Sequence, residues 1–527
     1  MKRREFLRRS ARSAAVLTGL SAMPQLAGCG KSKKAGSDKS RRPNILFAIS
    51  DDQSWIYAGA YGSKIAKTPN FDRVARKGVL FNNAFCVAPQ CSPNRACILT
   101  GRNIWQLEEA GVHAANFPKK FQVYTDLLEE SGYFVGFTGK PWGPGNWEIT
   151  GWPRNPAGIE YNDQKMDSMP ARGMRNTDYA GNFEQFINDR SDDQPFCFWF
   201  GASEPHRVYE DGAGLKAGKR LEDAHVPKFF PDVETVRSDI LDFAFEIEWF
   251  DKHLGRMLKI IEDAGELDNT LVVVTSDNGM PFPRAKANLY EYGIHMPLAV
   301  QWPARVSGGR VVDDLISFID YAPTFMEAAG LKPIPAMTGK SFLNVLKSKE
   351  QGVVDKTRAW ALSGRERHTH ARPDNLTYPC RSIRTQQYLY IWNVKPERWP
   401  AGDPRGSGEP EGLHDVDASP TKSYLIDHRH DPDIKPFYDL AFKKRPEEEL
   451  FDINKDPDCV NNLAGKPEFL AVKEDLKATL KQNLARQGDP RMHGFGDIFE
   501  SYPRYSRMRN FPGFKKRGEY NPKYQVK

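Results

Sequence analysis

The chain has 527 residues, 39% of them hydrophobic, and a formal net charge of +7 at pH 7. Most of the charge lies at the N-terminus, because residues 1–42 contain twelve basic and two acidic side chains, a balance of +10 that leaves −3 for the remainder. A remainder without excess positive charge argues against a nucleic-acid-binding protein. The length favours one large domain with a smaller one.

The first residues have the layout of a bacterial export signal. A basic start precedes an apolar run near Ala14–Met23 and small residues before Cys29. Arg3-Arg4 resembles the twin-arginine signal, and Leu26-Ala27-Gly28-Cys29 resembles a lipobox, whose cysteine is lipidated after cleavage. The alternative is an ordinary signal peptide with a chance cysteine. Residues 1–29 are therefore predicted to direct export of the protein. The mature protein would be either periplasmic or a membrane-anchored lipoprotein.

A charged segment, residues 30–43, follows this signal and is predicted to be a flexible linker. No later segment offers the roughly 18 apolar residues that a membrane span needs. We therefore expect membrane contact only through the N-terminal lipid anchor.

Two short apolar runs end in acidic or amide side chains. Residues 44–50 stop at Asp51 and Asp52, and residues 270–276 stop at Asp277 and Asn278. Continuous apolar runs of this length are typical of strands buried on both faces. Ligands of such sheets bind beyond the carboxyl ends of the strands, where both oxygen clusters would lie.

Strand-like and helical segments alternate through residues 44–350. Further strands are expected at residues 134–138, 195–201 and 297–302, and amphipathic helices at residues 71–77, 124–131 and 240–264. This alternation predicts an α/β fold with a large, mostly parallel sheet covered by helices on both faces. We expect residues 44–350 to form the catalytic domain.

The pattern changes beyond residue 350. Short strands are expected at residues 360–363, 380–384, 388–392 and 449–453, followed by a helix near residues 467–486. Residues 395–445 form a long insertion rich in Pro, Gly, Asp and His, and loops of that length are usually functional or disordered. Residues 351–510 are thus predicted to form a C-terminal subdomain with a small antiparallel sheet and a helix, and residues 511–527 a tail.

The strand-end residues Asp51, Asp52, Asp277 and Asn278 supply hard oxygen ligands and no soft ligand. Such a set suits Ca²⁺, or Mg²⁺, rather than zinc. One acidic pair alone would be weak evidence, because acidic residues at strand ends are also common as caps and turns. Its repetition at two strand ends favours a metal site.

The segment Cys91-Ser92-Pro93-Asn94-Arg95, followed by Leu99-Thr100-Gly101-Arg102, resembles the signature of the type I sulfatase family. The resemblance extends over roughly residues 43–485 and implies an alkaline phosphatase-like fold. It also implies that a formylglycine-generating maturation enzyme oxidises Cys91 to Cα-formylglycine, an aldehyde that becomes hydrated.

The same resemblance implies a role for each residue of the site. The hydrated aldehyde at Cys91 would be the nucleophile and a metal ligand, and Arg95 would hold it and the metal carboxylates in place. Lys140 and Lys286 match lysines that bind sulfate oxygens, where fixed positive charge stabilises the transition state. His206 matches the histidine that protonates the leaving group.

One position departs from the family pattern. Many relatives have a histidine two residues after the lysine equivalent to Lys140, where it serves the hydrated aldehyde. Here Trp142 occupies that position. Another base replaces the histidine or sulfate elimination proceeds differently, so no residue is assigned to that step.

Two stretches resemble the N-sulfoglucosamine sulfohydrolase (heparan sulfamidase) branch of the family, residues 277–290 and 378–384. Lys286 stands where that branch has an arginine, which keeps the charge but loses the planar fork. The expected substrate is a sulfated glycan, with either N- or O-desulfation.

The segment 363–372 is dense in cationic residues. We expect contacts to carboxylates or sulfates of a polyanionic sugar from Arg365, His368, His370 and Arg372. A solvated polar loop is the alternative interpretation.

Two other functions remain open. A phosphatase or phosphodiesterase of the alkaline phosphatase superfamily would use Ser or Thr and two zinc ions, whose extra His and Asp ligands are not evident. A catalytically inactive glycan-binding lipoprotein would have the same sequence if Cys91 stayed a plain thiol.

The cysteines after Cys29 contain no C-x-x-C pair, which argues against a zinc site. Their spacing does not predict any disulfide pairing.

Overall fold

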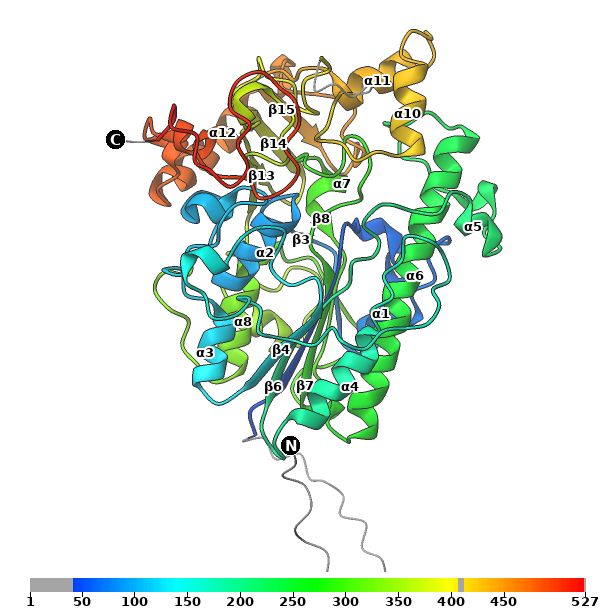
Figure 1. Cartoon of the computed structure of the whole chain (residues 1–527), viewed down its shortest axis with the longest axis vertical. Helices are drawn as coiled ribbons and strands as arrows, with labels where there is room; N and C mark the ends of the chain where they lie inside the picture. The colour runs from blue at the N-terminus through cyan, green and yellow to red at the C-terminus, as the bar shows by residue number, and fades with distance from the viewer. Residues whose placement is uncertain (1–40, 406–411, 526–527) are drawn as a thin grey trace, which may run out of the picture. The chain divides into compact units, whose positions relative to one another are not determined.

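The computed structural model describes residues 41–405 and 412–525 (Figure 1). The predicted export signal, the lipobox at Cys29 and almost all of the predicted linker lie outside the described residues. None of the helices in the described part combines the length and the apolar composition of a membrane span.

A large mixed sheet forms the centre of the protein. The order across the sheet is β10 (Arg310–Val312), β2 (Val79–Phe81), β9 (Leu298–Gln301), β7 (Thr270–Ser276), β1 (Asn44–Ser50), β6 (Phe196–Gly201), β4 (Phe134–Gly139) and β5 (Ile159–Glu160). Strands β7, β1, β6 and β4 form its parallel core, and β9 runs antiparallel beside β7. The mostly parallel sheet predicted from the apolar runs is confirmed.

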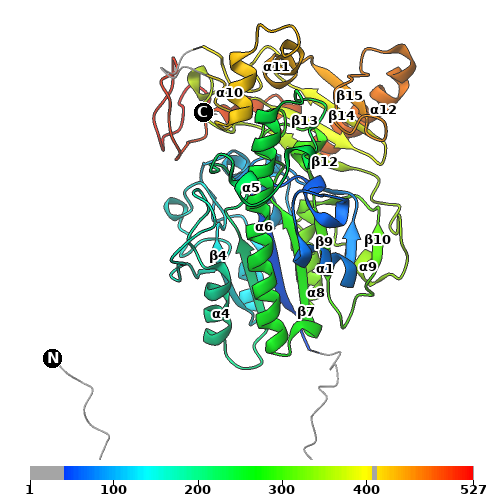
Figure 2. The same cartoon turned by 90° about the vertical axis from the view of Figure 1, so that its right-hand side faces the viewer.

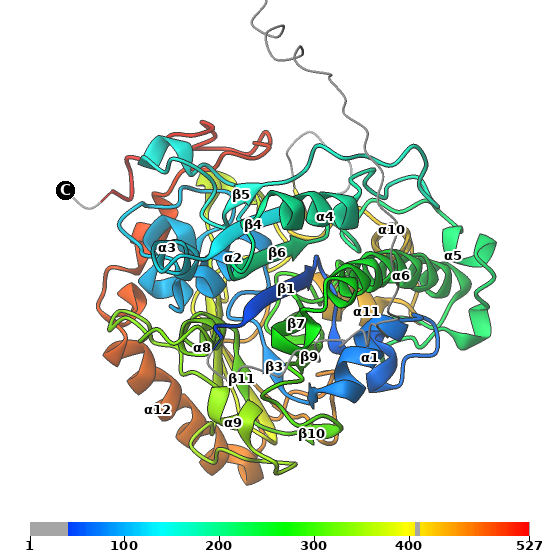
Figure 3. The same ribbon diagram turned by 90° about the horizontal axis from the view of Figure 1, so that it is seen from below.

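Helices cover both faces of this sheet (Figure 3). One face packs against α1 (Pro69–Lys77), α4 (Tyr179–Asp189) and α6 (Glu234–Asp263), and the other against α2 (Cys91–Thr100), α3 (Tyr124–Glu130) and α8 (Tyr321–Ala328). The alternation of side chains along β1 explains both layers, because Leu46 and Ala48 join the first core while Ile45, Phe47 and Ile49 join the second. All five are fully buried.

A second, antiparallel sheet follows in the C-terminal region (Figure 2). Its order is β12 (Ala361–Arg365), β13 (Cys380–Arg384), β14 (Tyr388–Asn393) and β15 (Glu448–Asp452), and α12 (Leu470–Arg486) packs against it. The Gly364 amide donates to the Val87 carbonyl at 2.7 Å, which ties β12 to the segment before α2. The small sheet with its helix is as predicted, while the boundary at residue 350 stays a prediction.

Three short strands form a further sheet in the order β11 (Ile316–Ser317), β3 (Ala84–Phe85) and β8 (His295–Met296). The remaining short helices are α5 (Ala213–Lys216), α7 (Glu291–Ile294) and α9 (Leu343–Lys347). The six described cysteines are all buried and free, so no disulfide forms within the described residues.

The long insertion contains helices rather than open loop alone. It includes α10 (Pro420–Asp427) and α11 (Lys435–Phe442), and α10 is fixed to α6 by a hydrogen bond from Thr421 Oγ1 to Asp239 Oδ2 at 2.6 Å. The predicted tail also packs on the protein, since the Asn521 amide donates to the Ser501 carbonyl at 2.7 Å.

Candidate active site

Four neighbouring parallel strands end at one edge of the large sheet, and each leads into residues predicted for the site. Ser50 at the end of β1 pairs with Ser276 at the end of β7, and Ile49 pairs with Gly201 at the end of β6. Gly201 in turn pairs with Gly139 at the end of β4. The next residues along these strands are therefore neighbours in space: Asp51 and Asp52, Asp277 and Asn278, Lys140 and, after a short loop, His206.

Three carboxylates form the centre of this edge. Ligand oxygens of Asp51, Asp52 and Asp277 all lie within 4.8 Å of one another, and all three residues are buried. Asn278 Nδ2 donates to Asp52 Oδ1 at 2.6 Å, and its buried Oδ1 has no hydrogen-bond partner among the described residues. An unpaired buried amide oxygen beside crowded carboxylates fits a hard, oxygen-coordinated cation such as Ca²⁺ or Mg²⁺.

The pKa values of these carboxylates reflect the crowding. Burial and the charge of Asp51 raise the pKa of Asp277 to about 7. Burial would also raise the pKa of Asp51, but Lys140, His206 and Arg95 outweigh it and hold that pKa well below its usual value. A divalent cation would favour the charged form of every carboxylate in the group.

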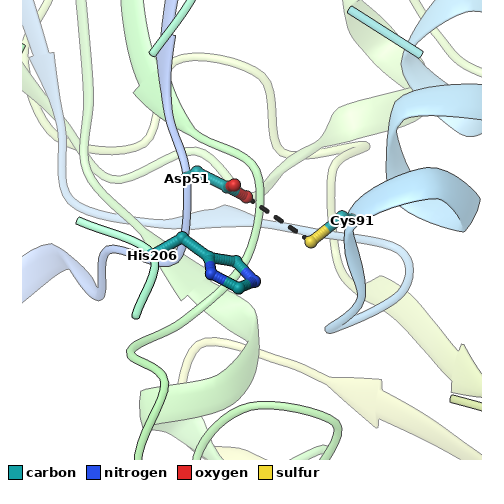
Figure 4. A group of neighbouring side chains, drawn as sticks. All are labelled: Asp51, Cys91 and His206. Atoms are coloured by element: carbon teal, nitrogen blue, oxygen red, sulfur yellow. Dashed lines mark hydrogen bonds between the residues drawn. The ribbon is translucent and has the colours of Figure 1, made fainter. Parts of the chain in front are cut away.

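Cys91 is the first residue of α2 and faces the carboxylates. Its Sγ lies 3.4 Å from Asp51 Oδ1, and Figure 4 shows Asp51, Cys91 and His206 turned toward one another. Burial and the charge of Asp51 raise the pKa of the thiol well above its usual value. An unmodified Cys91 would therefore stay protonated and be a weak nucleophile.

Arg95 lies one helical turn after Cys91 and is completely buried. Its Nε donates to Asp277 Oδ2 at 2.9 Å, and its Nη1 donates to the Lys140 carbonyl at 2.5 Å. Its Nη2 lies 3.5 Å from Asp51 Oδ1. One guanidinium thus joins the segments that follow β1, β4 and β7.

Two lysines contribute positive charge from separate segments. Lys140 Nζ pairs with Asp51 Oδ2, and Lys286 Nζ donates to Asp52 Oδ2 at 2.6 Å. Lys286 is almost fully buried, while part of the Lys140 side chain is exposed. In spite of burial, the neighbouring carboxylates raise the pKa of both ammonium groups, so both stay charged.

His206 lies at the open side of this group. Its Nδ1 is 2.6 Å from the Arg207 carbonyl, which favours a proton on Nδ1, and its Nε2 is 3.8 Å from Asp52 Oδ2. Asp51, Lys140, Arg175 and His206 help to line a cavity of about 390 Å³. The cavity gives a small anionic group access to the lysine and histidine side chains.

Trp142, at the position that departs from the family pattern, is a buried packing residue. Its Nε1 donates to the Ser92 carbonyl at 3.1 Å, and its ring packs edge-to-face on Phe117. His113, which the sequence did not single out, lies nearby, because the next amide, Ala114, donates to Ser92 Oγ at 3.1 Å. Burial and the proximity of His368 hold the pKa of His113 well below its usual value. A lone histidine gives no sequence signal for this position.

The four residues expected to contact a polyanionic sugar are all buried. Arg365 Nη2 donates to Asp415 Oδ2 at 2.7 Å, and Arg372 pairs with the same oxygen. His370 Nδ1 accepts the Arg509 amide at 2.7 Å. Direct substrate contact is therefore not supported for Arg365 and Arg372, whose charges are paired inside the protein.

His368 differs from the other three because it lies toward the site. Its ring packs edge-to-face on His113 with centroids 4.8 Å apart. Burial lowers its pKa to about 3. The charge of Lys286 also lowers this pKa, whereas the charge of Asp417 opposes the shift.

Asp417, from the long insertion, also reaches the site and was missed from the sequence. Its Oδ2 lies 3.1 Å from Lys286 Nζ. Ligand atoms of Asp52, His206 and Asp417 lie within 4.8 Å of one another. The length of the insertion was the only sequence signal that it had a function.

Comparison with known proteins agrees with this geometry. Residues 43–331 match the family model described as Sulfatase, and residues 284–431 match the model described as N-sulphoglucosamine sulphohydrolase, C-terminal. The human N-sulphoglucosamine sulphohydrolase is 28% identical over 496 residues, which cover 86% of this chain and 92% of the relative. An ulvan-active sulfatase of Formosa agariphila is 26% identical over 501 residues, covering 85% of this chain and 76% of the relative.

A solved protein in complex with its substrate D-glucosamine-2-N,6-O-disulfate has the same fold, with a TM-score of 0.63 and 19% identity over 86% of this chain and 99% of that one. The fold class, the small C-terminal sheet and the family resemblance predicted from sequence are confirmed. This chain belongs to the sulfatase family and is a hydrolase of sulfate esters or sulfamates.

Proposed function

We propose that this protein removes sulfate from a sulfated glycan, with residue 91 as the nucleophile after oxidation of Cys91 to formylglycine. The observation that carries the proposal is the position of Cys91 Sγ, 3.4 Å from Asp51 in a group of buried oxygen ligands. Burial and Asp51 raise the pKa of the Cys91 thiol, so the unmodified cysteine would be a poor nucleophile there. A formylglycine-generating enzyme would be the maturation partner.

The residues of the site have separate roles in the proposed reaction. Asp51, Asp52, Asp277 and Asn278 would hold one divalent cation, Ca²⁺ or Mg²⁺, which would supply positive charge against the sulfate oxygens. The modified side chain would supply a hydroxyl nucleophile at residue 91.

Lys140 and Lys286 provide fixed charge for the remaining sulfate oxygens. In its imidazolium form, with Nδ1–H held by the Arg207 carbonyl, His206 would deliver its Nε2 proton to the atom that leaves sulfur. Arg95 holds the carboxylates and the first turn of α2 in position.

The preferred substrate is a glucosamine residue that carries an N-sulfate. The match to the N-sulphoglucosamine sulphohydrolase C-terminal model and the human relative support this choice. An N-acetylglucosamine-6-O-sulfatase of Bacteroides thetaiotaomicron is 22% identical over 557 residues, so O-desulfation of another glycan is the second candidate.

The expected location is outside the cytoplasm, as a periplasmic or lipid-anchored protein. The basic N-terminus and the lipobox-like sequence at Cys29 support export and anchoring. Glycan breakdown at the cell surface would suit such an anchor.

Peptide mass spectrometry and sulfate release test the proposal together. In active protein matured with a formylglycine-generating enzyme, the peptide with residue 91 should be lighter than its cysteine form, and Cys91→Ala should abolish sulfate release while the protein still folds. Turnover of a phosphate ester in preference to sulfate would favour the phosphatase alternative. A folded, unmodified protein that binds glycans without turnover would favour the inactive lipoprotein.

A further inference from the structure

Asp417 is brought to the active site by the long insertion and is held there firmly. The preceding residue, Val416, is buried, and its carbonyl accepts Lys422 Nζ at 3.2 Å. Ser419 caps α10 by accepting the Lys422 amide, and Thr421 fixes α10 to Asp239 of α6. These contacts hold the segment that carries the Asp417 carboxylate in place beside Lys286.

The Asp417 carboxylate borders both the sulfate-binding and the proton-donating side of the site. Its Oδ2 accepts Lys286 Nζ at 3.1 Å, and its ligand atom lies within 4.8 Å of the atoms of His206 and Asp52. The side chain is 28% exposed, so part of it faces the open side. Lys286, His206 and His368 outweigh burial and keep its pKa below the usual value, so it is negatively charged.

A negative charge at this position does not suit a sulfate oxygen, which it would repel. It suits a hydrogen-bond donor on the atom that links sulfate to the sugar, because His206 delivers its proton to that same atom. A sulfamate has a nitrogen there that carries one hydrogen. A sulfate ester has an oxygen there that carries none, and its lone pairs would face the carboxylate.

We propose that Asp417 selects sulfamates over sulfate esters by accepting the N–H of the linking nitrogen. This inference rests on the proposed function. When the S–N bond breaks, its electron pair stays on nitrogen, and nitrogen takes one proton from His206 Nε2 to leave as a primary amine. The original N–H remains on nitrogen, which is protonated as the S–N bond breaks, and it keeps its hydrogen bond to Asp417 through the step.

The test compares two substrates that differ only in the linking atom at carbon 2: glucosamine N-sulfate and glucose 2-sulfate. Wild type should have the higher kcat/KM for the sulfamate. Asp417→Asn, which keeps the shape but loses the charge, should reduce the ratio of the two kcat/KM values about 10- to 100-fold. Asp433→Asn, in an exposed part of the same insertion, should leave the ratio unchanged.

An unchanged ratio in Asp417→Asn would overturn the inference, because a residue that only positions Lys286 would affect both substrates equally. Free glucosamine provides a second readout, since its ammonium group should inhibit wild type about ten-fold more strongly than Asp417→Asn. Equal inhibition would also count against the inference. Absence of sulfate release from every sulfated sugar by mature wild type would instead overturn the proposed function.

Discussion

Arg95 Nε donates to Asp277 Oδ2 at 2.9 Å, joining the helix that carries Cys91 to a strand end 182 residues further along the chain. Both side chains are completely buried. The contact links the nucleophile position to the candidate metal ligands, so both depend on one ion pair.

Arg95→Met should lower the free energy of unfolding by about 3–5 kcal/mol, because it leaves the buried Asp277 carboxylate without its guanidinium partner. Arg95→Lys should recover only part of this loss, since lysine lacks the planar fork that reaches both Asp277 and the Lys140 carbonyl. Denaturant unfolding measures both variants. Equal stability of wild type and Arg95→Met would contradict the assigned contact.

Removal of divalent cations should lower the melting temperature, because crowded buried carboxylates lose their counter-charge. Readdition of Ca²⁺ at about 100 times its Kd should restore about 2.7 kcal/mol. Calorimetry before and after chelation measures the effect. Asn278→Ala should weaken the Ca²⁺ response, whereas Asn461→Ala, on the surface, should not. A melting temperature insensitive to Ca²⁺ in wild type would argue against the metal site.

Asp415→Asn should destabilise the protein by about 3–5 kcal/mol, because Arg365 and Arg372 would then be buried without a carboxylate. Asp433→Asn is the matched control, with an expected change within about 0.5 kcal/mol. If Asp415→Asn changed substrate affinity while stability stayed constant, the two arginines would have the sugar-binding role first expected of them.

Trp142→Phe should keep sulfate release within a few-fold of wild type, because the indole packs and holds Ser92 rather than carrying a proton in the reaction. Loss of the indole hydrogen bond should lower the free energy of unfolding by about 1–3 kcal/mol. Trp142→Ala should cost about 3–5 kcal/mol through the cavity it leaves. A complete loss of turnover in a stable Trp142→Phe protein would assign Trp142 a catalytic role.

Glu246→Gln should remove part of the pH dependence of stability. Burial, together with Glu204 and Asp242, raises the pKa of Glu246 from 4.5 to about 9. Glu246 therefore stays protonated in the fold while it ionises in the unfolded chain, and the stability present below pH 4.5 is lost as pH rises toward 9. The slope is at most about 1.4 kcal/mol per pH unit.

Unfolding free energies measured between pH 5 and 9 should thus fall less steeply for Glu246→Gln than for wild type. Glu234→Gln, exposed on the same helix, is the control and should follow the wild-type slope. Identical slopes for all three proteins would contradict the raised pKa.

The apolar runs of the sequence were enough to predict the central strands of the large sheet and the residues that end them, but not its short strands β2, β5 and β10. Apolar runs such as Asn44–Ser50 can only be buried, and the polar residues after them must lie at the sheet edge. Asp51 and Asp277 were predicted for that reason, whereas Cys91 was predicted from the motif that resembles the family signature. The strands of the small sheet were also found from their short runs between turns.

Which other side chains meet this edge could be seen only in the folded protein. Asp417 and His113 reach it from an insertion and a loop with no regular period, so no local pattern predicts them. The charge density of segment 363–372 did not reveal that Arg365 and Arg372 share a carboxylate 50 and 43 residues away. Pairing in a folded protein depends on distance in space, and that distance is set only when the chain segments pack together.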